Sequence, residues 1–162
     1  MGNKQTNAQG EMQLVAEWIA TLPASYKSKT HVNVGAQTLQ YVGLRLNAAQ
    51  QRAFGVWNDW ADARIFTGRE VWIVEGKVVA TGGAYGQVLD YVNQYPSSAD
   101  YEQFAPAPIV PYVLTMASRA RTASLFLGYG VNTIVFSPTF PLSDALAKLF
   151  PAAQILQQGN PA

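Results

Sequence analysis

The apolar segment 71–79, VWIVEGKVV, constrains the possible folds more than any other stretch of the chain. Its β-branched residues predict a buried strand, yet it contains Glu75 and Lys77. Side chains alternate along a strand, so these two charges lie on one face, about 7 Å apart, while Val74 and Gly76 point to the other face, toward a helix. Burying an ion pair in a dry core is costly. We therefore expect the pair at a strand end or in a cleft.

The regions around this segment show regular periodicity. Residues 61–79 predict two strands joined at Thr67-Gly68, and residues 84–94, after Gly82-Gly83, predict a helix. Pro111 argues for an edge position or a late start of the strand 109–117. The other predicted elements are helices over 11–22, 47–60, 118–129 and 142–150 and strands over 30–34, 39–46, 109–117 and 132–137.

This order of elements predicts an α/β fold with a central mixed β-sheet and helices on both faces. The chain has 162 residues, of which about half are apolar, a size that suits one compact domain. We expect that domain over residues 11–150, between a flexible N-terminal tail (1–10) and a C-terminal tail (151–162).

Composition excludes several classes of protein. The net charge is only +1, whereas a protein that simply coats nucleic acid is usually more basic, so phosphate binding would require local clustering of basic residues. The sequence contains no apolar run long enough for a membrane span. It has no cysteine, which excludes disulfides and thiolate metal sites and suits a cytoplasmic location.

A second carboxylate upstream suggests a chemical role for the charged pair. Asp62 lies at the start of the strand that precedes 71–79, and pairing of the two strands across the Thr67-Gly68 turn brings Asp62 toward Glu75. Two carboxylates can hold a divalent cation. A neighbouring lysine such as Lys77 can orient a water or offset charge on a phosphate oxygen.

The combination of Asp62 with the EGK tripeptide 75–77 on an apolar strand resembles the PD-(D/E)xK nuclease superfamily, also called restriction-endonuclease-like. Ala61 replaces the proline that is frequent in the family. The resemblance covers roughly residues 11–137 and implies a restriction-endonuclease-like core of the order αβββαβ.

The resemblance also implies roles for the residues of these motifs. The carboxylates of Asp62 and Glu75 and the backbone carbonyl of Gly76 would hold Mg²⁺ or Mn²⁺, and Lys77 would assist the attacking water. The activity implied is hydrolysis of DNA phosphodiester bonds, with a homodimer or a partner supplying much of the grip on DNA.

Three further residues match secondary features of the family. Gln87 and Tyr91, one helical turn apart, resemble the Gln-x-x-x-Tyr arrangement of its exonuclease and resolvase branches. Gln87 would orient the site or contact a phosphate, and Tyr91 would support Gln87 or stack near the nucleic acid. Glu17 in LVAEWI matches the glutamate that several branches carry on the first helix.

Alternative interpretations of these residues stay open. Glu75 and Lys77 are also compatible with a surface ion pair on an edge strand. Arg119 and Arg121, near the start of a predicted helix, suit phosphate binding or ordinary solvation. His31, the only histidine, is more typical of a structural residue. At the level of the whole protein, the alternative is a nuclease-fold structural or adaptor component of a larger assembly such as a phage particle, which would be virion-associated.

Overall fold

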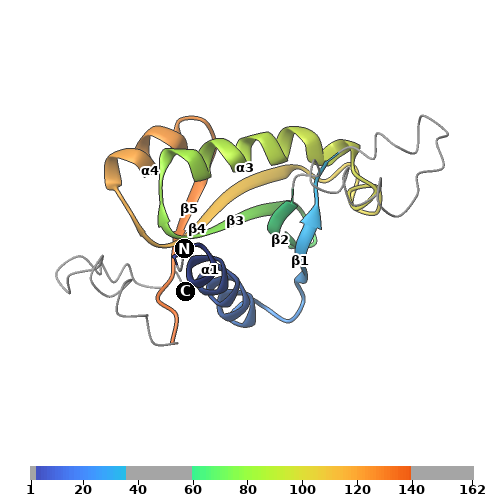
Figure 1. The fold of residues 1–162 in the computed structure, drawn as a ribbon. Coiled ribbons are helices and arrows are strands. Elements are labelled where there is room, and N and C mark those ends of the chain that lie inside the picture. Colours follow the sequence, from blue (N-terminus) through green and yellow to red (C-terminus); the bar gives the residue numbers. More distant parts are fainter. Residues whose placement is uncertain (1–2, 36–59, 140–162) are drawn as a thin grey trace, which may run out of the picture.

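The computed structural model describes residues 3–35 and 60–139, which form a five-stranded sheet with three α-helices (Figure 1). β1, β2 and β3 are antiparallel neighbours, whereas β3, β4 and β5 are parallel. The predicted α/β class and mixed strand directions are therefore confirmed. The strands lie across the sheet in the order β1 (Lys27–Asn33), β2 (Trp60–Phe66), β3 (Val71–Ala80), β4 (Ile109–Ser118) and β5 (Asn132–Val135).

Helices cover both faces of this sheet, as predicted (Figure 1). α1 (Asn3–Ala20) lies on one face, and α3 (Gly82–Gln94) and α4 (Ala120–Leu127) lie on the other. Each face has its own apolar core. One joins α1 to the sheet through Leu14, Val15, Trp18, Ile65, Val74 and Leu114, and the other joins α3 to it through Tyr85, Val88, Tyr91, Val71, Ile73 and Val113.

The β2–β3 hairpin turns where the sequence predicts it. Thr67 N–H donates to the Glu70 carbonyl (3.0 Å), and Glu70 N–H donates to Thr67 Oγ1 (3.1 Å). Gly68 has φ of 93°, a left-handed conformation that glycine adopts without a steric penalty. Beyond the turn, Trp72 and Val74 join the α1 core and Val71 and Ile73 the α3 core, which confirms the expected alternation along β3.

α1 begins at Asn3, eight residues before the predicted start at Glu11, so most of the expected N-terminal tail is helical. Residues 3–9 contain no proline, and a single Gly10 costs a helix only about 1 kcal/mol. The predicted strand 39–46, helix 142–150 and tail 151–162 lie outside the described residues. The predicted helix 47–60 does too, except for Trp60, which begins β2.

The expectation that Pro111 marks an edge strand or a late strand start is wrong. β4 already begins at Ile109 and lies between β3 and β5. The β4–β5 ladder begins only at Tyr112, paired with Asn132, so the proline precedes it and leaves it intact.

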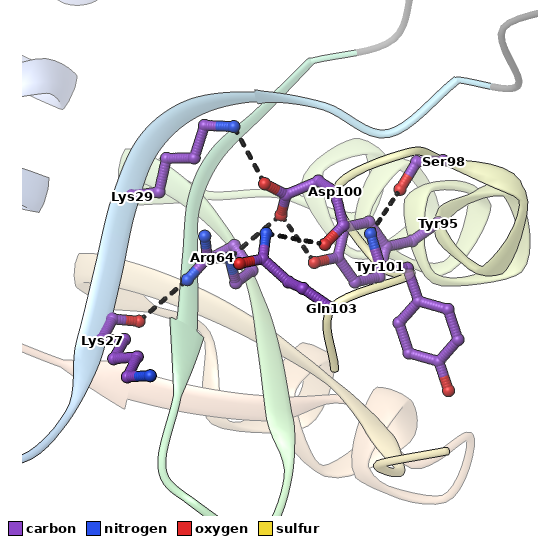
Figure 2. Close-up of polar contacts among 8 residues, drawn as sticks. All are labelled: Lys27, Lys29, Arg64, Tyr95, Ser98, Asp100, Tyr101 and Gln103. Carbon is purple, nitrogen blue, oxygen red and sulfur yellow. Dashed lines mark hydrogen bonds and ion pairs between the residues drawn. The ribbon is translucent and has the colours of Figure 1, made fainter. Parts of the chain in front are cut away.

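A buried ionic network ties the loop after α3 to the first two strands (Figure 2). Asp100 Oδ2 accepts a hydrogen bond from Arg64 Nε (3.0 Å) and another from the Tyr95 hydroxyl (2.7 Å). Its Oδ1 accepts from Lys29 Nζ (2.8 Å). Burial would raise the pKa of Asp100, but the hydrogen bonds that it accepts lower it below its ordinary value. The charged carboxylate therefore fixes the loop against β1 and β2.

Substituting Asp100 by alanine is expected to lower the free energy of unfolding by about 3 kcal/mol, because Arg64 would keep a buried charge without its carboxylate. Lys29→Met is the matched control. The Lys29 side chain is 53% exposed, so this partner of Asp100 should contribute less than about 1 kcal/mol. Urea denaturation monitored by circular dichroism measures both, and equal losses for the two variants would contradict a dominant role for the Arg64–Asp100 pair.

Candidate functional site

The site begins where the β2–β3 ladder ends. Paired residues run from Phe66 and Val71 at the turn to Ala63 and Val74, and the next positions in register are Asp62 and Glu75. At this point a side-chain hydrogen bond replaces the backbone hydrogen bonds between the two strands. Asp62 Oδ2 accepts it from Gly76 N–H at 2.7 Å. This bond fixes the carboxylate beside the backbone of the EGK tripeptide.

Lys77 joins the second carboxylate to this group. Its Nζ lies 2.8 Å from Glu75 Oε1. Glu75 is buried, with 2% of its side chain exposed, whereas the Lys77 side chain is 29% exposed. The sequence predicts that the two charges lie on one face of the strand, at an open strand end or cleft, whereas in the structure they are in contact and Glu75 is buried.

α1 supplies a third carboxylate, and it comes from Glu11. Lys77 Nζ lies 3.3 Å from Glu11 Oε2. Glu11 was not among the predicted site residues, although helical periodicity carried the signal: positions 11, 14, 15 and 18 share one helix face, and Leu14, Val15 and Trp18 are buried.

Glu17, the predicted helix carboxylate, is directed elsewhere. Its Oε2 accepts hydrogen bonds from Thr139 N–H (2.7 Å) and from Thr139 Oγ1 (2.9 Å). It is therefore bonded to the segment that follows β5, and not to Lys77. We refer to Glu11, Asp62, Glu75 and Lys77 as the carboxylate–lysine cluster.

Gly76 allows α1 to approach this cluster closely. A Cβ built at position 76 would lie 2.6 Å from Val15 Cγ2, 3.4 Å from Asp62 Oδ2 and 3.6 Å from the Glu11 carbonyl oxygen. A side chain at this position would therefore require Val15 to shift. The glycine of EGK thus has a packing role that the resemblance alone does not reveal.

The electrostatics of the cluster are dominated by negative charge. Burial, followed by the charge of Asp62, raises the pKa of Glu75 to about 7. Burial also raises the pKa values of Asp62 and Glu11 above their ordinary values. Burial would lower the pKa of Lys77, but the hydrogen bond and charge of Glu75 raise it, so the ammonium stays charged. Three carboxylates thus surround one cation, an arrangement in which further positive charge is favourable.

The donor atoms suit a hard cation, although only two carboxylates and one backbone carbonyl provide them. Asp62 and Glu75 provide carboxylate oxygens, the ligands that Mg²⁺ and Mn²⁺ prefer, and Gly76 provides a backbone carbonyl between Glu75 and Lys77. Within residues 3–35 and 60–139, however, no three histidine, aspartate or glutamate side chains are arranged as metal ligands. A metal here would depend on two carboxylates, the backbone and water.

Gln87 and Tyr91 are bonded to each other on α3. Gln87 is exposed, and its Nε2 donates to the hydroxyl of Tyr91, whose ring is part of the α3 core. This bond supports the predicted pairing of the two residues, but it runs along α3 and does not join them to the carboxylates. Arg119 and Arg121 are exposed at the start of α4, just beyond the end of β4.

An aromatic pair flanks the cluster on the β1 side. His31 lies opposite Asp62, between the register pairs of Thr30 with Ala63 and of Val32 with Ala61. Its φ of 51° places it in the left-handed region, and its ring stacks on Trp60 with centroids 4.4 Å apart and planes inclined by 9°. Sequence patterns gave no indication of this stack.

Comparisons of the chain with protein families, with curated proteins and with solved structures find no match. None of the helices in the described parts of the chain has the length and apolar character that crossing a membrane requires.

Gly76→Ala is expected to lower the free energy of unfolding by about 1–3 kcal/mol, because the added methyl group overlaps Val15. Truncating the neighbour in the double variant Gly76→Ala/Val15→Ala should recover part of this loss. A double-mutant cycle from urea denaturation measures the coupling. Strictly additive effects would show that the contact with α1 does not limit position 76.

The wild-type protein in metal-free buffer should lose stability between pH 5 and pH 8. The folded pKa of Glu75 is about 7, above its ordinary 4.5, so its protonated form stabilises the fold at low pH and this contribution disappears as the pH rises through 7. The loss should be roughly 2 kcal/mol. Glu75→Gln, which keeps Asp62, Glu11 and Lys77, should remove this part of the pH dependence. Parallel slopes of unfolding free energy against pH for both proteins would contradict the prediction.

Proposed function

We propose that this protein is a metal-dependent nuclease of the PD-(D/E)xK type that hydrolyses DNA phosphodiester bonds. The order α1-β1-β2-β3-α3-β4, with an antiparallel β1–β2–β3 half and a parallel β3–β4 crossover, agrees with the αβββαβ core that the resemblance implies. This agreement extends over the described residues of the core and supports the family assignment without depending on the site.

The observation that carries the proposal is the convergence of Asp62 and the EGK tripeptide at the end of the β2–β3 ladder. Asp62 accepts from Gly76 N–H at 2.7 Å, and Lys77 lies 2.8 Å from Glu75. These residues come from two strands and were selected by sequence pattern alone. A random acidic residue upstream of EGK would have no reason to be bonded to its middle residue.

Each residue of the cluster has a role in this chemistry. Asp62, Glu75 and the Gly76 carbonyl would hold Mg²⁺ or Mn²⁺. The bound ion would polarise the scissile phosphate and lower the pKa of a bound water. Lys77, whose ammonium stays charged, would orient that water and offset negative charge on a phosphate oxygen. Glu11 would hold the lysine in place from α1.

DNA binding requires positive charge that the cluster itself does not supply. The net charge of the chain is only +1. Arg119 and Arg121 are exposed at the start of α4, and Ser118, the residue before Arg119, pairs with Ala80 at the end of β3. We propose that these arginines contact the DNA backbone, that Gln87 contributes a phosphate contact and that a homodimer or a partner provides the remaining grip.

The test is cleavage of a panel of DNA substrates in the presence of Mg²⁺ or Mn²⁺. Lys77→Ala and Asp62→Asn should each reduce the cleavage rate by about 100-fold or more, because each removes a group that stabilises charge in the transition state. Glu102→Gln, which changes an exposed carboxylate in the loop after α3, is the matched control and should retain the wild-type rate.

Variants of the two α1 carboxylates, Glu11 and Glu17, make the same experiment more specific. Glu11→Gln should lower the rate because Glu11 contacts Lys77, whereas Glu17→Gln should not, because Glu17 bonds to Thr139. An inactive wild-type protein would reject the enzyme proposal. So would variants at Lys77 and Asp62 that cleave as fast as the wild type.

One observation favours a second candidate function, a nuclease-fold structural or adaptor component of a larger assembly such as a phage particle. Glu75 is buried, and Lys77 is already engaged by Glu75 and Glu11, so the protein's own side chains partly fill the site. On this proposal the wild type does not cleave, Mg²⁺ leaves its melting temperature unchanged, and substitutions in the cluster alter stability alone. Raised thermal stability with Mg²⁺, abolished by Asp62→Asn, would favour the nuclease instead.

A further inference from the structure

A cavity of about 420 Å³ lies beside the carboxylate–lysine cluster, between β1, the start of β2 and the loop after α3. Its volume falls in the range of small-molecule sites. The cavity is lined, among others, by Lys29, His31, Asn33, Trp60, Ser98 and Gln103. None of these residues belongs to the carboxylate–lysine cluster, so the cavity needs an explanation of its own.

One wall of the cavity is aromatic. His31 and Trp60 stack nearly parallel, with their centroids 4.4 Å apart, and both are exposed, Trp60 by 36%. An aromatic side chain of this size that remains exposed next to a cavity offers a flat apolar surface. Nucleobases bind such surfaces by stacking, whatever their sequence.

Polar side chains also line the cavity. Gln103 Nε2 donates to the Asp100 carbonyl oxygen at 3.2 Å, and Asp100 is itself fixed by Arg64 and Lys29 (Figure 2). Carboxamides and hydroxyls, here from Asn33, Gln103 and Ser98, can both donate to and accept from the edges of a base. The Lys29 ammonium lies 2.8 Å from Asp100, but Asp100 is also paired with Arg64 at 3.0 Å, so these three groups together keep one positive charge. The cavity therefore offers the base of a nucleotide both an aromatic surface and hydrogen-bonding groups.

The register of β1 and β2 places this cavity next to the cluster. His31, which lines the cavity, lies opposite Asp62, and Trp60 precedes Asp62 by two residues on β2. Directly opposed residues of an antiparallel pair have Cα atoms about 4.5–5.5 Å apart. A nucleotide with its base in the cavity would thus have its backbone near the carboxylates.

We propose that this cavity binds an unpaired nucleobase, and that the substrate is a nucleic acid with an unpaired nucleotide next to the phosphodiester held at the cluster. The second clause rests on the proposed nuclease function. Base binding does not, because it needs neither the cluster nor a metal. A base that is paired in a duplex is stacked between its neighbours and cannot enter, so the cavity selects ends, gaps or single strands.

Binding is measured by fluorescence anisotropy in EDTA, where no cleavage occurs. The probes are a blunt DNA hairpin and the same hairpin with a thymidine overhang at its 5′ or 3′ end. Matched overhangs of abasic residues keep the phosphates but lack the bases. The wild type should bind one of the thymidine overhangs roughly 5- to 100-fold more tightly than its abasic counterpart or the blunt hairpin.

Trp60→Leu should remove this preference and leave binding of the blunt hairpin unchanged, whereas Trp60→Phe should retain most of it. Tyr129→Leu, a change at another exposed aromatic residue that follows α4, is the matched control and should behave as the wild type. Circular dichroism verifies that each variant is folded. If a Trp60 variant does not fold, the comparison of thymidine with abasic overhangs on the wild type still decides the question.

Equal affinity for thymidine and abasic overhangs overturns the proposal, and so does the absence of measurable binding. A preference that survives in folded Trp60→Leu also overturns it. Cleavage, assayed separately with Mg²⁺, distinguishes this proposal from the previous one. Base preference without cleavage rejects the nuclease but keeps the base site. Cleavage without base preference rejects the base site but keeps the nuclease.

Discussion

The hydrogen bond from Gly76 N–H to the Asp62 carboxylate is the interaction on which the candidate site depends. Up to Ala63 and Val74, β2 and β3 are joined by their backbones. Beyond that point a side chain satisfies the backbone donor of β3, which keeps the strands associated while their ladder ends. A buried backbone donor has to be paired, so Asp62 is needed for the strand as well as for any chemistry. This double role ties the position of the carboxylate to the stability of the sheet.

The close approach of α1 to β3 is the second constraint. With only a hydrogen at position 76, Val15 can pack against the strand backbone, and Glu11, one turn before Val15, then reaches Lys77 at 3.3 Å. Glu75, the residue before Gly76, is buried, with 2% of its side chain exposed. Burial in this position, together with the nearby Asp62, raises the pKa of Glu75 to about 7. The electrostatic character of the cluster is thus a consequence of helix packing as much as of the charged residues themselves.

Sequence patterns predicted most of the described fold because its elements are locally encoded. The hairpin at Thr67-Gly68, the helix after Gly82-Gly83 and the alternation along β3 all depend on neighbouring residues. Asp62 and the EGK tripeptide were found for the same reason, since a tight turn determines which positions of two strands face each other.

Contacts between distant segments were not predictable in this way. The choice of Glu11 over Glu17 depends on the rotation of α1 against the sheet, although the buried face of the helix contained the information. The Asp100 network and the His31–Trp60 stack join segments that are remote in sequence, and neither follows any periodic pattern. The strand 109–117 was predicted nearly to its observed bounds, but the edge position or late start inferred from Pro111 was wrong because local rules ignore where a neighbouring ladder begins.

The balance of charge in the cluster connects the two proposed functions. Three carboxylates around a single lysine leave an excess of negative charge, which a divalent cation or a proton can offset. A nuclease requires the cation, and a structural protein can keep the proton on Glu75 near neutral pH. The aromatic cavity favours the nuclease over the structural protein. A purely structural cluster would gain nothing from an exposed His31–Trp60 stack next to Asp62, whereas a site that acts on a phosphodiester needs a surface that holds the adjoining nucleotide.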